Sequence, residues 1–455
     1  MYIFKSKYSI NPKKIDNLYF SKNQSLSGRV TVPGDKSISQ RALIISLISS
    51  GKTIIEDILD SEDVYHTLNA VKELGANIKK KSGVLEVKGI GIGNLLSPSK
   101  PIYMGNSGTG TRLLLGLVAG SNALVTFYGD ESLTNRPMER VVSPLLEMGA
   151  SVISAKNTKL PITISGARLK GFTLPIDYKL LTPSAQVKSA ILLAALSARG
   201  NSFVTEYKET RNYTERMLKS SGVFIQVNKK NKNKRVISIK GTSFIKSKNI
   251  KVAGDPSSAV FLAVAAIITK KSSISIENVL LDKFRLTVFK TLKKMGANIR
   301  IIKENGSQCK IIVKSSKLKN ILVKSNKSSS LIDEYPILSI AAACGSGDMV
   351  MEGLSELRFK ESDRYRAIIN GLNKAGVTAV GYKDSIKIIG KKSIKGGCTI
   401  NAENDHRIAM SFNILSLVSE KPILVKGNRS ICTSFPSFFD TLKSLGVASS
   451  FYERN

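Results

Sequence analysis

The sequence predicts an α/β protein of six similar units, grouped as two domains of three. Its 455 residues are too many for one ordinary core and suggest two or three domains. Two similar stretches, residues 30–48 (VTVPGDKSISQRALIISLI) and 249–267 (NIKVAGDPSSAVFLAVAAI), start half a chain apart. A helix tail, a glycine and a strand start also recur at intervals of 70 to 80 residues, at Gly75, Gly149, Gly222, Gly296, Gly376 and Gly446.

Each of the six glycines has the same physical interpretation. Glycine adopts the left-handed conformation that closes a helix, and the alternating residues that follow continue as a strand. One such copy is common in α/β proteins, but six at near-constant spacing indicate a repeat.

The two Gly-Asp turns are interpreted as the points where the chain crosses between domains. Residues 35–253 then form the first domain, and residues 1–34 with 254–455 form the second. We expect a cleft with the active site where the crossings meet.

Composition excludes several classes of protein. The longest apolar run, Ala259–Ile268, is about half of the roughly 20 residues that span a bilayer, so no membrane segment is expected. The basic N-terminus lacks the apolar core of a secretory signal and is interpreted as a short extension. Four separated cysteines and two isolated histidines favour neither a disulfide framework nor a zinc site, and a cytoplasmic location is expected.

The formal net charge of +35 permits a nucleic acid, a membrane surface or an anionic small molecule as partner. The most basic run, residues 228–235 (NKKNKNKR), lies between two strand-like segments and is interpreted as a solvated hairpin tip. It lacks the interleaved aromatic residues on which bases stack, so a nucleic-acid partner is not favoured.

The stretch GDKSISQRAL, residues 34–43, has the pattern of an anion cradle. Ser37 and Arg41 share a helix face, and Lys36 lies beside the free amides of the first helical turn. A serine cap with two solvated cations is the alternative, and the Gly-Asp entry favours the cradle.

Three further motifs have ordinary alternatives of their own. YMGNSGTGTRLLLGL, residues 103–117, is a glycine-rich turn before an apolar helix and lacks the end of a Walker loop. SLTNRPMERV holds Arg136 and Arg140, and LTPSAQVKSA holds Ser184, Gln186 and Lys188 at a helix start. Caps and surface charges would account for the last two equally well.

Two charged clusters occur in the second half. In residues 356–368 (ELRFKESDRYRAI), Lys360 and Arg364 are spaced as helical i,i+4 neighbours and Glu361 and Arg364 as i,i+3 neighbours. A solvated ladder of salt bridges is the alternative there. In AENDHRIAMSF, Arg407 adjoins an apolar helix, where charges are usually paired or used.

Seven motifs in this order, VPGDKSISQRAL, GNSGTGTR, LTNRPM, SAQVKSA, IDEYPIL, KESDR and NDHRIAMSF, resemble the 3-phosphoshikimate 1-carboxyvinyltransferase (EPSP synthase) family. The resemblance covers nearly the whole chain after the N-terminal extension. It implies two domains, each of three βαβαββ units in an inside-out α/β barrel, in agreement with the six repeats.

The resemblance also implies the reaction: the enolpyruvyl group of phosphoenolpyruvate passes to the 5-hydroxyl of shikimate 3-phosphate, and phosphate leaves. The catalytic residues implied are Asp333, which orients or deprotonates the hydroxyl, Glu361, which exchanges a proton with the methylene carbon, and Lys36. No metal or other cofactor is implied, and the implied partners are the two anionic substrates. A monomer is expected by default. The shikimate 3-phosphate ligands implied are Lys36, Ser37, Arg41, Ser184, Ala185, Gln186, Arg211, Asp333 and Lys360; those of phosphoenolpyruvate are Lys36, Gly108, Arg136, Gln186, Arg364 and Arg407.

One departure and three alternatives accompany the resemblance. Some members carry a lysine where this chain has Thr433, which leaves phosphate release to other cations. Enolpyruvyl transfer to a nucleotide-linked amino sugar typically uses a mobile-loop cysteine, and no cysteine precedes Cys309. RNA 3'-phosphate cyclisation would suit the charge, but it lacks the KESDR and NDHR pair. A lysine-rich RNA-binding module would not need carboxylates beside cations.

Overall fold

The computed structural model describes residues 12–22, 25–81, 83–155, 158–231, 234–304 and 306–451. Its described part divides into two compact units: the first unit is residues 36–252, and the second unit is residues 12–35 and 253–451. The expected limits differ from these by one residue at each crossing, and residues 1–11 of the expected second domain lie outside the described residues.

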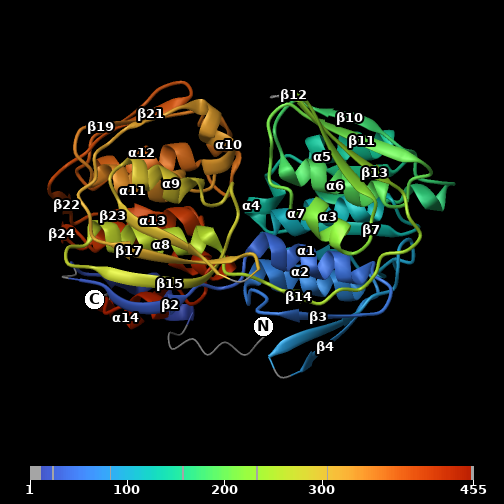
Figure 1. The fold of residues 1–455 in the computed structure, drawn as a ribbon, viewed down its shortest axis with the longest axis horizontal. Helices are drawn as coiled ribbons and strands as arrows, with labels where there is room; N and C mark the ends of the chain where they lie inside the picture. Colours follow the sequence, from blue (N-terminus) through green and yellow to red (C-terminus); the bar gives the residue numbers. More distant parts are fainter. Residues whose placement is uncertain are drawn as a thin grey trace. The chain divides into compact units, whose positions relative to one another are not determined.

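The first unit contains three copies of one strand-helix-strand-helix-hairpin pattern (Figure 1). Its elements are α1 (Lys36–Leu47), β3 (Lys52–Glu56), α2 (Glu62–Glu73), β4 (Asn77–Lys81), β5 (Val84–Lys88), β6 (Ile102–Tyr103), α3 (Gly108–Ala119), β7 (Leu124–Tyr128), α4 (Glu131–Thr134), α5 (Glu139–Glu147), β8 (Ser151–Ala155), β9 (Lys159–Ser165), η3 (Ala167–Leu169), β10 (Asp177–Leu180), α6 (Ala185–Ala195), β11 (Asn201–Glu206), α7 (Tyr213–Ser220), β12 (Ile225–Asn231), β13 (Lys234–Lys240) and β14 (Ile250–Lys251).

The second unit repeats the pattern with shorter strands near its end. Its elements are η1 (Pro12–Asn17), β1 (Leu18–Phe20), β2 (Ser27–Thr31), α8 (Pro256–Ile268), β15 (Ser273–Leu280), α9 (Thr287–Lys294), β16 (Asn298–Lys303), β17 (Gln308–Lys314), β18 (Leu322–Val323), η4 (Ser325–Lys327), α10 (Ser328–Leu331), α11 (Tyr335–Ala343), β19 (Asp348–Glu352), η5 (Ser355–Phe359), α12 (Arg364–Lys374), β20 (Ala379–Gly381), β21 (Ser385–Ile389), β22 (Ile394–Gly396), β23 (Thr399–Asn401), α13 (His406–Ser416), β24 (Ser419–Lys421), β25 (Leu424–Lys426), η6 (Asn428–Thr433), α14 (Phe438–Ser444) and β26 (Ser449–Phe451).

The four-stranded sheets of the described residues share one topology. In the order β6-β7-β9-β8 the first two strands are parallel and the remaining pairs antiparallel, and β10-β11-β13-β12 and β18-β19-β21-β20 repeat it. In the sheets that contain β3 and β15, the parallel strand is one that lies next to a chain crossing in the sequence. Strand β14 pairs with β3, and β2 pairs with β15. In the last repeat, the parallel pairs β22-β24 and β23-β25 replace a four-stranded sheet.

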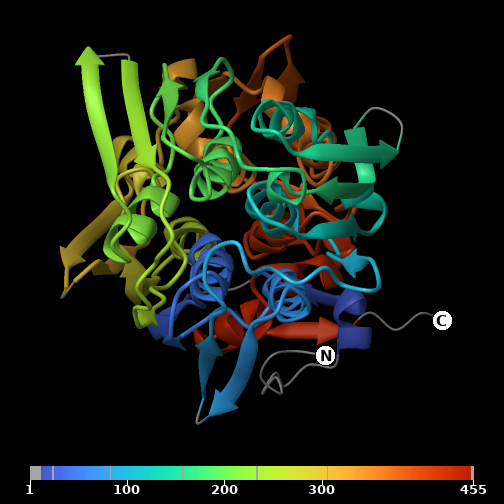
Figure 2. The ribbon, with the colours of Figure 1, turned by 90° about the vertical axis from the view of Figure 1, so that its right-hand side faces the viewer.

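The helices that follow the first strand of each repeat are buried, and the sheets lie outside them. In β7 the alternating Val125 and Phe127 are buried, as expected for a strand with one face on a core. Figure 2 shows the hairpins β4-β5, β8-β9 and β12-β13 around the helices of the first unit. The hairpin expected around residues 228–235 is confirmed by β12 and β13, and its residues 232 and 233 lie outside the described part.

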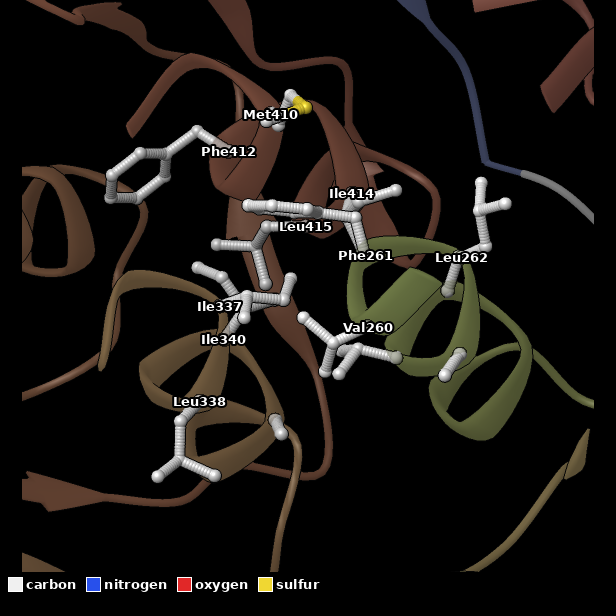
Figure 3. Close-up of a cluster of buried hydrophobic side chains, with 14 of the residues drawn as sticks. Val260, Phe261, Leu262, Ile337, Leu338, Ile340, Met410, Phe412, Ile414 and Leu415 are labelled. Atoms are coloured by element: carbon white, nitrogen blue, oxygen red, sulfur yellow. The ribbon is translucent and has the colours of Figure 1, made fainter. Parts of the chain in front are cut away.

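The core of the second unit lies among α8, α11 and α13. Figure 3 shows Phe261, Ile337 and Leu415, one from each helix, in a single apolar cluster, and all three are buried. Helices apolar on every side must be covered on every side, and the surrounding sheets provide this cover.

The six repeat glycines end the outer helices as predicted. Gly75, Gly149, Gly222, Gly296, Gly376 and Gly446 follow α2, α5, α7, α9, α12 and α14, with φ angles of 116°, 96°, 91°, 97°, 88° and 93°. This left-handed region favours glycine, so the repeat visible in the sequence is a repeat of helix ends.

The N-terminal residues from 12 onward are part of the second unit. β1 pairs with β26, and the Ser416 hydroxyl donates to the Phe20 carbonyl at 2.6 Å. The Asn428 amide of η6 donates to the Leu18 carbonyl at 3.1 Å, and Phe20 packs against Phe439. This segment therefore fastens η6 and the C-terminal strand to the core.

Candidate active site

Most of the predicted site residues lie at the N-terminal ends of buried helices. Lys36 begins α1, Gly108 begins α3, and Ser184 is the N-cap of α6. In the second unit Asp333 lies two residues before α11, and Arg407 is the second residue of α13. Helix N-terminal ends carry free amides and a positive dipole end, so the sequence motifs sit where anions bind well.

In the first unit, two side chains of α1, Lys36 and Arg41, are held by neighbouring polar groups. The Lys36 ammonium lies 2.8 Å from an Asp63 carboxylate oxygen on α2. The buried Arg41 guanidinium donates to the Thr214 hydroxyl at 2.8 Å, the Ser189 hydroxyl at 3.0 Å and the Ser37 carbonyl at 3.0 Å. Arg41 is thus fixed on the face that the i,i+4 spacing predicted.

Helices α3 and α6 are joined at their starts through Gln186. Its side-chain oxygen accepts from Arg112 at 3.0 Å, and its amide donates to the Thr109 hydroxyl at 2.7 Å. At Ser107, the N-cap of α3, the hydroxyl accepts from the Gln40 amide of α1 at 2.6 Å. The starts of α1, α3 and α6 therefore lie together in the first unit.

The glycine-rich turn before α3 supports Arg136. Arg136 is 8% exposed, and its guanidinium donates to the Asn106 side chain. A methyl group built at Gly108 would lie 2.7 Å from Arg136 Nη1 and 3.0 Å from Arg112 Nη1. Burial raises the pKa of Asp130, although its bond from the Leu133 amide and the nearby Arg136 act to lower it. Because Gly108 has no side chain, the space beside its Cα stays open, and the guanidinium groups of Arg136 and Arg112 border this space.

In the second unit, Arg364 gathers three carboxylates. Its side chain is 1% exposed; Nε donates to Asp405 Oδ2 at 2.7 Å, Nη2 bonds Glu361, and Nη1 lies 3.6 Å from Asp333 Oδ1. Burial acts to lower the pKa of Arg364, but Asp405, Glu361 and Asp333 raise it well above its ordinary value. Arg364 is therefore a permanent cation.

The helical spacing expected for Lys360 and Arg364 is wrong. Helix α12 begins only at Arg364, because Asp363 caps it through the Arg366 amide, and Lys360 lies in the extended segment before it. The two cations nevertheless cluster, since Lys360 Nζ lies 3.7 Å and Arg364 Nη1 3.6 Å from the same Asp333 oxygen.

Arg407 connects the start of α13 to the turn before α11. Its amide donates to Asp405 Oδ1 at 2.9 Å, and its guanidinium donates to the Asp333 carbonyl at 2.7 Å and to the Ser257 hydroxyl at 3.4 Å. Glu334 Oε1 lies 3.7 Å from Nη1. The expectation that charges at this helix edge are paired is confirmed.

Two further positions that the sequence analysis named lie in other elements. Arg211 is half-buried in the loop between β11 and α7. Thr433 ends η6, and its hydroxyl donates to the Ser430 carbonyl at 2.8 Å.

Several contact residues were not predicted from the sequence. Asp63 has the pattern of an ordinary acidic residue in the first turn of a helix, and Arg112 that of a solvated arginine. Glu334 lies within the motif IDEYPIL and Ser257 within residues 249–267. They are 73 and 150 residues from Arg407, so the sequence did not predict their contacts with it. One feature of the sequence could have indicated such a contact: the acidic pair Asp333-Glu334 comes directly before an apolar helix.

The geometry suits small anions with several oxyanion groups. Arginine forks match carboxylate and phosphate oxygens, and the carboxylates beside them can accept or donate protons. Across the described ranges, no group of three His, Cys, Asp or Glu side chains is arranged to hold a metal ion. The described helices include none long and apolar enough to span a membrane.

Comparison with known proteins decides the family. The family model described as EPSP synthase (3-phosphoshikimate 1-carboxyvinyltransferase) matches residues 20–442. The chain belongs to this family. Among curated relatives named 3-phosphoshikimate 1-carboxyvinyltransferase, that of Chelativorans sp. (strain BNC1) is 44% identical over 432 residues, 93% of this chain and 96% of the relative. That of Bartonella henselae is 43% identical over 431 residues, 93% and 97% of the two chains.

Solved structures agree with the family assignment. The EPSP synthase of Acinetobacter baumannii superimposes with a TM-score of 0.82 at 37% identity, covering 96% of this chain and 99% of that one. The enolpyruvyl transferase NikO of Streptomyces tendae gives a TM-score of 0.77 at 15% identity over the same shares, which shows the fold alone. The resemblance, the transferase class and the two-domain inside-out α/β fold predicted from the sequence are confirmed, and the alternative reactions are not favoured.

Proposed function

We propose that this EPSP synthase family member transfers the enolpyruvyl group of phosphoenolpyruvate to the 5-hydroxyl of shikimate 3-phosphate, in the shikimate pathway. The observation that carries the proposal is the Arg364 cluster. There a permanent cation and two further basic side chains adjoin Asp333 and Glu361, so oxyanion binding and proton transfer have their groups in one place.

We assign the substrates to the residues that the resemblance implied. Lys36 is assigned to both substrates, because an ammonium has three donors and can bond Asp63 and an oxyanion together. Gln186 is also assigned to both. Shikimate 3-phosphate binds Lys36, Ser37, Arg41, Ser184, Ala185, Gln186, Arg211, Asp333 and Lys360; phosphoenolpyruvate binds Lys36, Gly108, Arg136, Gln186, Arg364 and Arg407.

The proton transfers are divided between two carboxylates with different neighbours. Asp333 accepts the hydroxyl proton as the substrate oxygen bonds to C2 of phosphoenolpyruvate, and Glu361 gives a proton to C3. The tetrahedral intermediate then loses phosphate while C3 returns a proton to Glu361, and the proton held by Asp333 leaves with the phosphate, which restores both carboxyls. Both carboxylates adjoin Arg364, and Asp333 also lies 3.7 Å from Lys360. Two carboxyls whose surroundings differ can hold opposite protonation states, as these two steps require.

Phosphate release tests the proposal directly. The purified chain should release phosphate from phosphoenolpyruvate only when shikimate 3-phosphate is also present. A nucleotide-linked amino sugar and an RNA 3'-phosphate serve as alternative substrates in parallel. Turnover with either alternative, and none with shikimate 3-phosphate, would contradict the proposal.

The remaining expectations stay predictions with their own measurements. An active site shared by the two domains predicts a smaller radius of gyration in X-ray scattering when shikimate 3-phosphate and an unreactive phosphoenolpyruvate analogue are added. The monomeric state is checked by sedimentation, the absence of a nucleic-acid partner by titration with RNA, and the cytoplasmic location by cell fractionation.

A further inference from the structure

Arg285 is a buried arginine that no part of the proposed reaction uses. It lies in the turn between β15 and α9, at 6% exposure. Asp282 fixes this turn, since its Oδ1 accepts from the Phe284 amide at 3.0 Å and the Arg285 amide at 3.2 Å. The backbone therefore holds the Arg285 side chain toward the interior of the second unit.

The Arg285 guanidinium adjoins three buried carboxylates. It bonds Asp255, and it lies 3.6 Å from Asp35 and 4.0 Å from Glu334. Buried carboxylates are costly without a cation, and a planar guanidinium can serve several of them at once. The charge of Arg285 is thus divided among groups from three segments.

Two of these carboxylates belong to the turns where the chain passes between units. Asp35 and Asp255 follow Gly34 and Gly254, which form a bridge. The Asp35 amide donates to the Ala253 carbonyl at 2.8 Å, and the Asp255 amide donates to the Pro33 carbonyl at 2.9 Å. Arg285 therefore anchors both chain crossings at one point of the second unit.

The third carboxylate connects Arg285 to Arg407. Nη1 of Arg285 and Nη1 of Arg407 lie 4.0 Å and 3.7 Å from the same oxygen, Glu334 Oε1. Ser257 adds a second link: its amide donates to Asp255 Oδ1 at 2.7 Å, its hydroxyl donates to Glu334, and it accepts from Arg407 at 3.4 Å.

We infer that Arg285 is a positioning residue for enolpyruvyl transfer. By sharing Glu334 with Arg407, it keeps the Arg407 guanidinium from closing onto that carboxylate and leaves it available to phosphoenolpyruvate. Arg407 is already slightly nearer to Glu334 than Arg285 is, at 3.7 Å against 4.0 Å. Without Arg285, the charge of Glu334 is no longer shared between the two arginines, and Glu334 and Arg407 form a tighter pair. The inference rests on the proposed role of Arg407 as a phosphoenolpyruvate ligand.

A double-mutant cycle tests this route. Arg285→Met should raise the KM for phosphoenolpyruvate about tenfold, as expected when a charged contact to an anion is diverted. The KM for shikimate 3-phosphate should change less. Adding Glu334→Gln should restore most of the phosphoenolpyruvate KM, because the carboxylate that captures Arg407 is gone. Arg300→Met, on the exposed side of β16, is the matched control and should leave both constants unchanged.

The outcomes separate this inference from the proposed site. If Arg407→Ala raises the phosphoenolpyruvate KM but Arg285→Met does not, this inference alone is wrong. If Arg407→Ala leaves that KM unchanged, the proposed ligand and this inference both fail. Equal effects of Glu334→Gln with and without Arg285 also overturn it, since a purely structural role predicts no recovery. If Arg285→Met does not fold, the same cycle is measured with Arg285→Lys, whose compact ammonium lacks the planar spread of donors that a guanidinium offers to several carboxylates.

Discussion

Replacing Gly108 by alanine should weaken inhibition by glyphosate more than binding of phosphoenolpyruvate. Resemblance to the EPSP synthase family implies that glyphosate, a larger anion, competes for the phosphoenolpyruvate end of the site, beside Gly108. The first residue of α3 has no side chain, and the space where a Cβ would lie is bordered by Arg136 and Arg112. We therefore expect the wild-type enzyme to be inhibited by glyphosate, and the alanine variant to lose more of this inhibition than of its affinity for substrate.

The structure sets the size of the displacement. The new methyl would lie 2.7 Å from Arg136 Nη1, whereas ordinary contacts begin at 3.4 Å. The guanidinium must therefore withdraw by about 0.7 Å, which a flexible side chain can do at the expense of its bond to the ligand. Charged hydrogen bonds contribute about 1.5–3 kcal/mol. Losing half of one, about 1 kcal/mol, raises the KM for phosphoenolpyruvate about fivefold.

Glyphosate, the longer anion, should lose the same part of the hydrogen bond from Arg136, and the new methyl should also crowd it sterically. Overpacking a fitted site costs about 1–3 kcal/mol. Taking about 2 kcal/mol, the inhibition constant rises about 30-fold more than the KM. Steady-state assays of both forms, with glyphosate varied at several phosphoenolpyruvate concentrations, give both constants.

A control separates crowding from damage to the turn. Gly171→Ala introduces a methyl with no other atom within 4 Å, but the φ of 151° at Gly171 strains a side chain there. This variant should therefore lower the melting temperature and leave both constants unchanged. Melting temperatures of all three proteins show whether Gly108→Ala is folded. A wild type indifferent to millimolar glyphosate, or equal factors for inhibitor and substrate, would refute the reasoning.

Three further predictions concern single side chains. Arg407→Ala should weaken phosphoenolpyruvate by about 1.5–3 kcal/mol while leaving shikimate 3-phosphate nearly unaffected; ligand titrations showing equal losses would contradict it. Glu361→Gln should lower kcat with both KM values nearly unchanged, and a rise in KM without loss of kcat would assign it to binding instead. Lys188→Met should destabilise the fold by about 3–5 kcal/mol in urea unfolding, because it leaves Glu206 and Glu215 buried without their cation, and less so in a variant that also carries glutamines at both positions.

The repeat and its glycines could be predicted because they depend on local structure. A helix that ends in left-handed glycine before a strand has the same short pattern in every copy, and the six φ angles confirm it. The buried helices could be predicted for a similar reason, since α8 and α11 are apolar on nearly every side.

Contacts between distant segments could not be predicted in this way. Lys36 and Asp63 are 27 residues apart, and Arg407 and Ser257 are 150 apart. Periodicity gives the face on which a residue lies, but it does not give the neighbour that this face meets. The error at Lys360 has a different cause: helical spacing was applied across a boundary that the Asp363 cap sets.

The two Gly-Asp helix starts show how one repeated backbone supports two kinds of chemistry. Lys36 and Arg41 of α1 correspond in the aligned stretches to Pro256 and Phe261 of α8. Phe261 lies in the apolar core (Figure 3). At these two positions the first copy therefore has cations and the second copy has residues without charge.

The start of α8 therefore has no cation of its own to hold an anion, and carboxylates occupy its surroundings instead. Asp255 caps it, and Glu334 accepts from Ser257. Helix ends alone thus do not determine where anions bind. In the second unit the cations come from Arg364 on an outer helix and Arg407 on α13, and each is held by carboxylates of the turns beside the helix starts. On the proposed assignment, phosphoenolpyruvate competes with these carboxylates for each guanidinium, so the division of charge at Glu334 and Asp333 helps to set its affinity.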